Sequence, residues 1–380
     1  MAFFWLLTGI PFLYVLLRVI APFRPFRWRR AVAAAVLFLV AFKFQLLRLF
    51  AGPMFFAPDL PNWFMVTTTW AFVTFLFFTV LLFVSDLVRS AVWAVRKLLR
   101  RPAGAFSARP GLLMSMSLLM FASVFAAWGM IEAIRPPEVR NVEFARPGLA
   151  PELDGFTIVL IADLHVDKTS TKAEVEEVVR RANALRPDVI VLAGDFVDGR
   201  VEQLGHKIEP LKGLRAGYGV FGVPGNHEYY SGYCEWMAFL RSLGIRMLEN
   251  EHRVAAGGKL ALAGITDPAA RIRQMEEPDV KKALAGVPDG AFKILVAHQL
   301  KNTREAAERG VDLQLSGHTH GGMIVGLDRF LALLNHGFVS GEYDVDGMKL
   351  YVSRGTSLWK GFPVRLGVPS EITCITLRRK

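Results

Sequence analysis

Five short clusters between residues 163 and 320 of this 380-residue sequence combine carboxylate, amide and imidazole side chains. Their members are Asp163 with His165, Asp195 with Asp198, Asn226 with His227, His298 alone, and His318 with His320. Oxygen and nitrogen donors of these kinds bind divalent ions, and a set without thiolates argues against a structural zinc site. The clusters therefore predict metal-assisted chemistry with manganese, iron or zinc.

Each cluster follows an apolar run that predicts a strand. The expected strands are 156–162, 188–193, 218–223, 260–263, 292–297, 311–315, 349–352 and 371–377, and helices are expected at 172–184 and 234–243. Strands that first alternate with helices and later pair more closely predict an α/β fold, a layered sandwich flanked by helices. Sites in α/β sheets form where loops leave the carboxyl ends of the strands, which is where these clusters lie.

The order of the clusters is far more specific than any one of them. The series Asp-x-His, Gly-Asp-x-x-Asp, Gly-Asn-His-Glu, a later His and Gly-His-Thr-His resembles the calcineurin-like metallophosphoesterase superfamily, from about Asp154 to the C-terminus. This resemblance implies a metallophosphoesterase-type β-sandwich and hydrolysis of a phosphoester at a binuclear metal centre.

The resemblance also implies a role for each residue of the clusters. The metal ligands would be Asp163, His165 and His320 for the first ion, Asn226, His298 and His318 for the second, and Asp195 as the bridge between the two. His227 would face the substrate as general acid or phosphate stabiliser, and Asp198 would orient His227.

Elementary chemistry agrees with this assignment. Two divalent ions about 3.5–4 Å apart can hold a phosphoryl oxygen and a hydroxide together, and they lower the pKa of bound water. A shared carboxylate such as Asp195 is a natural bridge, and His227 can give a proton to the leaving oxygen.

Three segments near the C-terminus resemble a membrane-associated branch of the superfamily: Gly341–Tyr343, Tyr351–Gly355 and Pro363–Arg365. That branch includes transmembrane metallophosphoesterases and is similar to one type of UDP-2,3-diacylglucosamine hydrolase, which acts in lipid A biosynthesis. The sequence departs from the branch at Met323, where Gln often follows the Gly-Gly pair, and the stretch 323–338 is unusually apolar. Both departures bear on the substrate rather than on the reaction.

The first third of the sequence predicts a membrane anchor. Four apolar stretches, at about 2–20, 31–50, 63–84 and 112–134, approach the roughly 20 residues that a helix needs to cross a bilayer. We therefore expect a four-helix transmembrane region over 1–134, a linker over 135–153 and a metallophosphoesterase domain over 154–380. The first stretch lacks a basic start and a cleavage site, so it predicts a retained span rather than a signal peptide.

The distribution of charge predicts the orientation of the anchor. Residues 1–135 hold 14 of the 45 Lys and Arg residues and 3 of the 34 Asp and Glu residues, which leaves 31 of each sign in the remainder. The basic residues between expected spans are Arg18, Arg24, Arg27, Arg29 and Arg30 in the first connection, and Arg89, Arg96, Lys97, Arg100, Arg101 and Arg109 in the third. The positive-inside rule then places both connections in the cytoplasm and the C-terminal domain on the periplasmic side of a bacterial-type inner membrane.

The leading hypothesis is hydrolysis of a phosphodiester or pyrophosphate bond in a lipid-linked substrate such as UDP-2,3-diacylglucosamine. It draws on the anchor and on a set of apolar residues near the clusters, although packing is the better explanation of each one taken singly. These residues are Tyr229, Tyr230, Trp236, Phe330, Leu331, Leu333, Leu334, Trp359 and Phe362. The lipid A precursor is handled on the cytoplasmic face, so either the predicted orientation or the lipid A substrate must yield. The alternative is a periplasmic phosphodiesterase or phosphatase for envelope substrates.

Two other classes of function are less favoured. A non-catalytic membrane scaffold would not need the complete ligand set. A nuclease would usually carry a basic face, whereas residues 136–380 are neutral overall, so no nucleic acid partner is expected. The expected partners are the lipid bilayer and the phosphoester substrate.

Overall fold

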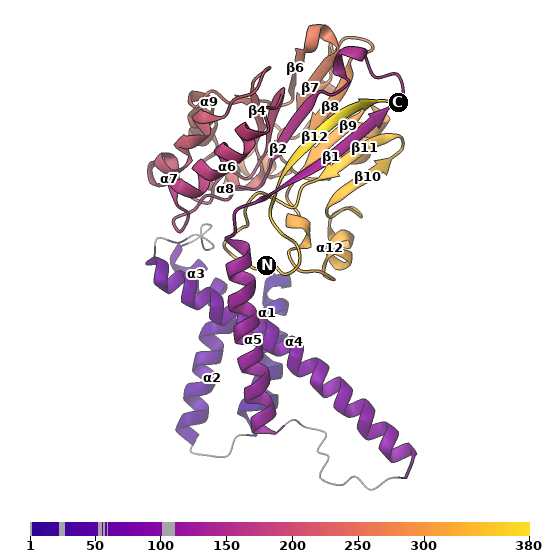
Figure 1. The fold of residues 1–380 in the computed structure, drawn as a ribbon. Coiled ribbons are helices and arrows are strands. Elements are labelled where there is room, and N and C mark those ends of the chain that lie inside the picture. Colours follow the sequence, from indigo (N-terminus) through magenta and orange to yellow (C-terminus); the bar gives the residue numbers. More distant parts are fainter. Residues whose placement is uncertain (1, 23–26, 52–54, 56–57, 59, 101–110) are drawn as a thin grey trace. The chain divides into compact units, whose positions relative to one another are not determined.

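The computed structural model describes the chain except for residues 1, 23–26, 52–54, 56–57, 59 and 101–110. It divides into two compact units (Figure 1), which we call the anchor unit, Met1–Ile131, and the sandwich unit, Glu132–Lys380. Of the predicted basic residues, Arg24, Arg101 and Arg109 lie outside the described part.

The anchor unit consists of helices. They are α1 (Ala2–Val15), which runs into the π-helical η1 (Leu16–Ile20), α2 (Arg27–Ala41), α3 (Lys43–Ala51), α4 (Asn62–Leu98) and α5 (Leu112–Ala133). In the described chain, α4 and α5 are each long and apolar enough to cross a membrane, and a bent pair formed by α2 and α3 could make one further span.

The expectation of four regular spans is thus only partly met. The segment expected to span at 2–20 contains a shorter apolar helix, Thr8–Ile20, which is below the length of a candidate membrane span. The stretch expected at 31–50 is bent by 68° between α2 and α3. Helix α4 is longer than the expected 63–84, because its 37 residues continue through Arg89, Arg96 and Lys97. These three residues therefore lie on a helix and not in a loop.

The sandwich unit contains two six-stranded mixed sheets. The first has the order β1 (Glu138–Arg146), β12 (Glu371–Arg379), β2 (Thr157–Ile161), β3 (Val189–Ala193), β4 (Val220–Val223) and β5 (Arg246–Met247). The second has the order β10 (Gly341–Val345), β11 (Met348–Val352), β9 (Leu313–Ser316), β8 (Phe292–Val296), β7 (Leu260–Gly264) and β6 (Glu251–Ala255). Strands β2 to β5 run parallel to one another, as do β7, β8, β9 and β11.

Alternating side chains of β2 divide the core into layers. Ile158 and Leu160 join a cluster that includes Ile294 of β8 and Leu313 of β9, so they fill the space between the two sheets. Val159 and Ile161 face the other way and join a cluster with side chains of the helices outside the first sheet. Because successive side chains point to opposite faces of a strand, β2 packs against the second sheet on one face and against helices on the other. It is therefore buried on both faces.

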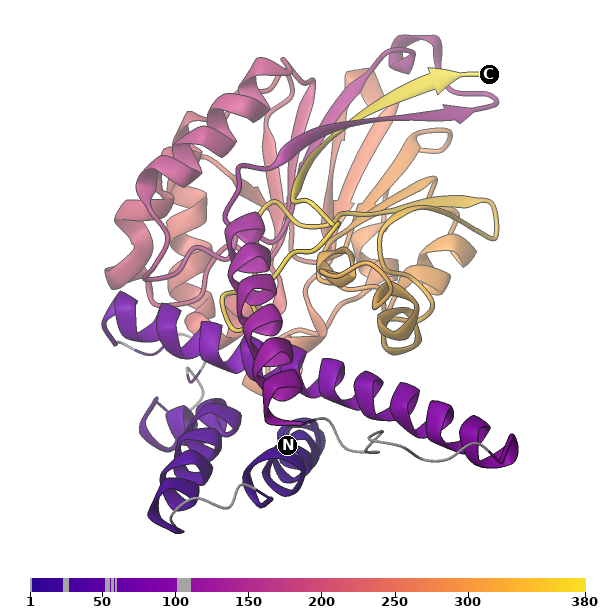
Figure 2. The same ribbon diagram turned by 60° about the horizontal axis from the view of Figure 1, so that its bottom comes forward.

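Helices cover the outer face of each sheet (Figure 2). Helices α6 (Lys172–Ala184), α7 (Val201–Ile208) and α9 (Tyr233–Ser242) contribute to the cluster on the first sheet. Helices α10 (Val280–Ala283) and α11 (Thr303–Glu308) contribute to the cluster on the second. The remaining helices are α8 (Asn226–Ser231) and α12 (Asp328–Leu334), with short 3-10 turns at Pro151–Leu153, Glu209–Gly213, Ala256–Gly258, Pro268–Arg273 and His320–Gly322.

The segment expected to be a linker contains a strand. Nine residues of 135–153 form β1, which pairs in parallel with β12 over its whole length. Only one face of this edge strand is buried, through Val142 and Phe144, and charged residues alternate with them. That mixed composition made the segment look like a linker.

Candidate metal centre

The predicted site residues emerge from the carboxyl ends of strands in both sheets. Asp163 follows β2 and Asp195 follows β3 in the first sheet, whereas His298 follows β8 and His318 follows β9 in the second. The backbone N–H of His318 donates to both oxygens of Asp163, at 3.1 Å each, and so joins the two sheets at this end. The sandwich therefore places the clusters together because parallel strands end on the same side.

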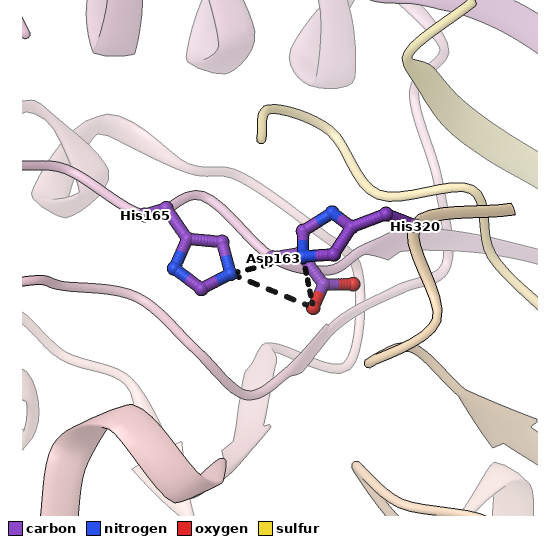
Figure 3. A group of neighbouring side chains, drawn as sticks. All are labelled: Asp163, His165 and His320. Atoms are coloured by element: carbon purple, nitrogen blue, oxygen red, sulfur yellow. Dashed lines mark hydrogen bonds and ion pairs between the residues drawn. The ribbon is translucent and has the colours of Figure 1, made fainter. Parts of the chain in front are cut away.

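Asp163, His165 and His320 form a first group that could hold a metal ion. Their side chains converge as Figure 3 shows: the Nε2 atoms of His165 and His320 lie 3.9 Å and 3.8 Å from Oδ1 of Asp163. The two Nε2 atoms are 3.2 Å apart.

Asp195, His298 and His318 form a second group that could hold a metal ion. Nε2 of His298 lies 3.1 Å from Oδ2 of Asp195. The same oxygen is 3.6 Å from Nε2 of His165, a member of the first group. One carboxylate oxygen is therefore within reach of both groups.

Hydrogen bonds of the ring nitrogens show that these donor sets fit cations. Nδ1 of His298 is 2.7 Å from the carbonyl oxygen of Ala193, which can only accept, so Nδ1 carries a proton and Nε2 faces Asp195. Burial lowers the pKa of His298, but Asp195 and Asp163 raise it well above its ordinary value, so without an ion Nε2 holds a second proton at the position that a cation would take. Nδ1 of His165 similarly faces a carboxylate, that of Asp198 at 3.2 Å, and its Nε2 faces the Nε2 of His320. These facing atoms are about 3 Å apart, which is the separation of two donors that each lie about 2.0–2.2 Å from one metal ion.

The protonation states suit metal binding. Burial lowers the pKa of His318 to about 3 and that of His320 well below its ordinary value, so both rings are neutral near pH 7. Burial alone would raise the pKa of Asp195, but the neighbouring imidazoles hold it well below the ordinary value. Within the described chain, Oδ1 of Asn226 is buried without a hydrogen-bond partner, as expected of an oxygen that would bind an ion.

His227 belongs to a third group that could hold a metal ion, together with His165 and Asp195, and Asp198 lies beside it. Nδ1 of His227 donates to Oδ1 of Asp198, whose other oxygen contacts His165, and Nε2 of His227 is 3.9 Å from Oδ2 of Asp195. Burial lowers the pKa of His227, but Asp195 and Asp198 together raise it to about 9. The ring is therefore protonated near neutral pH, and 13% of its side chain remains exposed.

The backbone at these strand ends adopts an uncommon conformation. Five predicted site residues have a positive φ in the left-handed region: Asp163, His165, Asp195, His318 and His320. Each such residue costs on the order of 1–2 kcal/mol, so packing must hold it there. Two glycines let neighbouring turns approach the carboxylates closely. A Cβ on Gly225 would lie 2.2 Å from Oδ1 of Asp195, and a Cβ on Gly317 would lie 2.5 Å from Oδ2 of Asp163.

Glu228 is a structural part of the site that the sequence reasoning did not single out. Its buried carboxylate accepts four backbone N–H groups: Oε2 from Asp195 at 3.0 Å and Gly225 at 2.7 Å, and Oε1 from Phe196 at 2.7 Å and Val197 at 3.3 Å. It thereby ties the turn that carries Asp195 to the turn that carries Asn226. Its place directly after His227 was the only sequence signal.

Arg365 is a second structural residue of the site, which the sequence analysis named only as the end of the segment Pro363–Arg365. Its side chain is buried, and its guanidinium donates to the carbonyl oxygens of His320 at 3.3 Å, Arg354 at 2.8 Å, Ser357 at 2.6 Å and Val368 at 3.1 Å. The planar fork of an Arg suits such a set of acceptors. Arg365 therefore holds the backbone of His320 against the loop that follows β11.

Asp267 is a third. It lies three residues after β7, at the same end of the sandwich, and burial raises its pKa to about 6. Oδ1 accepts from the backbone N–H of Ala269 at 2.8 Å and from Gln299 at 3.0 Å, and Oδ2 is buried without a partner in the described structure. The signal that could have found it was an acid after an apolar run, the same pattern as in the clusters.

The apolar residues suspected of lining the site fall into separate places. Tyr229 and Trp236 are buried in the core, whereas the rings of Tyr230 and Trp359 lie 5.5 Å and 6.3 Å from the ring of His227. Leu331 and Phe362 are half-buried, and the exposed members are on α12: Phe330, Leu333 and Leu334. Of these suspected apolar residues in the described chain, Tyr230 and Trp359 are thus the two whose rings lie beside the partly exposed ring of His227.

Comparison with known proteins identifies relatives of the sandwich unit. The model of the calcineurin-like phosphoesterase family matches residues 156–322. The chain is 37% and 35% identical to the transmembrane proteins with metallophosphoesterase domain of Bos taurus and Danio rerio; the matches cover 74% and 69% of this chain. It spans less than two thirds of the length of either vertebrate relative, 64% and 62%. An uncharacterized metallophosphoesterase of Campylobacter jejuni is 34% identical, over 71% of each chain.

Glu228→Gln should destabilise the sandwich unit. The amide nitrogen cannot accept, so two of the four backbone N–H groups would lose their acceptor, at a cost of about 1–3 kcal/mol. Thermal unfolding of the full chain in detergent measures the effect, with the exposed Glu176→Gln as the matched control. Equal midpoints for the two variants would contradict the structural role of Glu228.

Proposed function

The chain belongs to the calcineurin-like phosphoesterase family, and from this membership we propose that the sandwich unit is a dimetal hydrolase of phosphodiester or pyrophosphate bonds. The observation that carries the proposal is the position of Asp195, whose Oδ2 lies within reach of both metal-binding groups. Two ions that shared this oxygen would lie close enough to act on one phosphoryl group.

The proposed ligands follow the two groups. Asp163, His165 and His320 would hold the first ion, Asn226, His298 and His318 would hold the second, and Asp195 would be shared by both. The mixture of carboxylate, amide and imidazole donors suits manganese, iron or zinc. The hydrogen bonds of His165 and His298 on their outer nitrogens keep the inner nitrogens free for the ions.

The residues of the chain divide the remaining chemistry among them. Bound divalent ions supply charge neutralisation at the phosphoryl group and a water of lowered pKa. His227, protonated near neutral pH and held by Asp198, gives its proton to the oxygen that leaves when the bond to phosphorus breaks. Tyr230 and Trp359 flank this ring and limit the access of bulk water to it.

The substrate class that we propose is an amphipathic phosphoester. The support is indirect: the chain carries apolar helices long enough to span a membrane, and two of its relatives are named as transmembrane proteins. UDP-2,3-diacylglucosamine is one molecule of this class, and a phosphodiester of the cell envelope is another. The names of the relatives given above state no substrate. The choice between these two substrates therefore depends on which side of the membrane the sandwich unit faces.

We propose that the sandwich unit faces the outer side of a bacterial-type inner membrane. Helices α4 and α5 are each long and apolar enough to cross a membrane without a second helix, and their direction is enough to set this orientation. Helix α4 is about 55 Å long at 1.5 Å per residue, well beyond a hydrocarbon core of about 30 Å, and its surplus end carries Arg89, Arg96 and Lys97. Positive residues stay in the cytoplasm, so α5 returns to the outer side.

Activity against a soluble aryl phosphodiester tests the reaction. With added manganese, the wild-type chain should turn over the substrate, and His227→Ala should lower kcat by about 10²–10⁴-fold because the proton donor is lost. Asp195→Asn should abolish turnover and reduce the bound metal, measured by elemental analysis of the purified protein. A chelator should remove activity, and returning the ion should restore it.

His206→Ala is the matched control for His227→Ala, because His206 is an exposed histidine on α7. It should retain full activity and full metal content. Wild-type protein that binds two ions yet hydrolyses no phosphodiester or pyrophosphate would defeat the hydrolase proposal, and so would equal activity of wild type and His227→Ala.

Reporter fusions in a bacterial host test the orientation. Alkaline phosphatase, which is active only outside the cytoplasm, should be active when fused after Lys380 and inactive when fused after Leu99. Green fluorescent protein should give the reverse pattern. Inverted patterns at both positions would place the sandwich unit in the cytoplasm and favour a nucleotide-linked lipid substrate.

A further inference from the structure

Exposed apolar side chains of the sandwich unit gather in one part of it. The large hydrophobic residues exposed in the described part of this unit are Ile134, Val139, Tyr218, Val254, Ile272, Val325, Leu327, Phe330, Leu333 and Leu334. Five of these ten lie within 325–334, on α12 and the turn before it, and Leu333 is 80% exposed. Single exposed apolar residues are common, but a contiguous group usually marks a contact surface.

The strand register places this group at the metal-centre end of the sandwich. Leu366 and Gly367 form bridges with Ile324, and the backbone N–H of Val325 donates to Leu366 at 3.0 Å, so the start of the apolar segment is tied to the loop before β12. Gly322 ends the turn that begins with the predicted ligand His320. The apolar segment therefore begins beside the metal centre.

The same register places the entry of the chain at this end. In the antiparallel pair of β12 and β2, Thr373 lies opposite Leu160, so Glu371 lies past the carboxyl end of β2, where Asp163 follows. Glu138, the first residue of β1, is paired with Glu371. Figure 1 shows β1 starting at the end of the sandwich where α12 lies, away from the C-terminus.

This entry point is close to a membrane-spanning helix. Helix α5 ends at Ala133, and the five residues from there to Glu138 can extend over at most about 18 Å. Ile134 and Val139, two more of the exposed apolar residues, lie on or beside this short connection. The metal-centre end of the sandwich is thus the end from which the chain is joined to α5, a candidate membrane span.

We infer that residues 325–334, the α12 segment, insert into the interface of the bilayer that α5 crosses. The segment has the composition of an interfacial helix: apolar Val325, Leu327, Phe330, Leu333 and Leu334 are exposed, and Arg329 lies on the same helix, where it can reach lipid phosphates. Continuity with the anchor makes lipid the occupant of this surface. The metal centre then opens at the level of the headgroups.

The consequence for the substrate rests on the proposed hydrolase function, whereas the membrane contact does not. A centre held at the headgroup level receives phosphoesters whose acyl part stays in the bilayer. The scissile phosphate then reaches His227 without leaving the interface.

Spin labelling of the full chain in vesicles of phosphatidylethanolamine and phosphatidylglycerol tests the contact. A label is placed at Leu333→Cys in a Cys234→Ser background, because Cys234 is the exposed native thiol and Cys374 is buried. The label should collide more often with oxygen, which enters the bilayer, than with a water-soluble nickel chelate. The matched control is Val254→Cys on β6, an exposed position outside the apolar segment, which should show the opposite preference.

Two results would overturn the inference. One is equal access of the nickel chelate to the labels at positions 333 and 254. The other is broadening of the spectrum at position 333 that disappears on dilution with unlabelled chain, because a second copy would then cover the segment.

A paired activity measurement tests the consequence. The double variant Phe330→Ser and Leu333→Ser should hydrolyse a diacyl phosphodiester in the vesicles about tenfold more slowly than wild type, since it loses apolar contact with the bilayer. Its activity on a soluble aryl phosphodiester should not change. Equal losses on both substrates would contradict an interfacial role, whereas a wild-type chain inactive on both would count against the hydrolase proposal and leave the spin-label result to decide the contact.

Discussion

The carboxylate of Asp195 must lie between two groups of buried imidazoles, and much of the surrounding backbone is arranged to hold it there. Oδ2 reaches the first group at 3.6 Å and the second at 3.1 Å. Oδ1 accepts from the backbone N–H of His227 at 2.9 Å, which fixes the rotation of the carboxylate. Glu228 holds the turn that carries Asp195 by accepting hydrogen bonds from four backbone N–H groups. Gly225 has no Cβ, which leaves space for the carboxylate of Asp195. Like charges and left-handed backbone make this arrangement costly, and the two packed sheets supply the stability that maintains it.

Asp198 connects the candidate metal centre to His227, the proposed proton donor. One of its oxygens contacts Nδ1 of His165 and the other contacts Nδ1 of His227. Burial would raise the pKa of this carboxyl, but the two imidazoles hold it below its ordinary value, so it remains ionised and orients both rings. A hydrogen-bonded network of this kind couples its members, because moving one ring changes the field at the other. The proposed proton donor and a proposed ligand of the first ion are therefore positioned by one side chain.

The two units differ in what their surfaces accommodate. The basic excess belongs to the first 135 residues, where it would mark the cytoplasmic ends of the helices, and the remaining chain has equal numbers of acidic and basic residues. A neutral sandwich has no long-range attraction for polyanions, which agrees with a small or lipid-linked phosphoester rather than nucleic acid. Its exposed apolar residues gather at the metal-centre end instead. A nucleic acid-binding enzyme attracts its substrate by charge. In this protein, apolar contact with the bilayer and the short connection to α5 would instead bring a lipid-linked substrate to the site.

The sequence by itself determined the buried strands, the order of the site clusters and the apolar helices. The runs 158–161 and 189–193 are short and apolar on both faces, which predicts strands buried between two layers, and α6 has the bounds that its spacing predicted. Tertiary structure alone decided that β1 completes a sheet, that α2 and α3 bend, and that α4 continues past residue 84. It also decided the roles of Glu228, Arg365 and Asp267, whose partners are backbone groups or side chains of other turns. The physical reason is that burial leaves a local pattern along the chain, whereas a hydrogen bond between two turns depends on how distant strands are placed side by side.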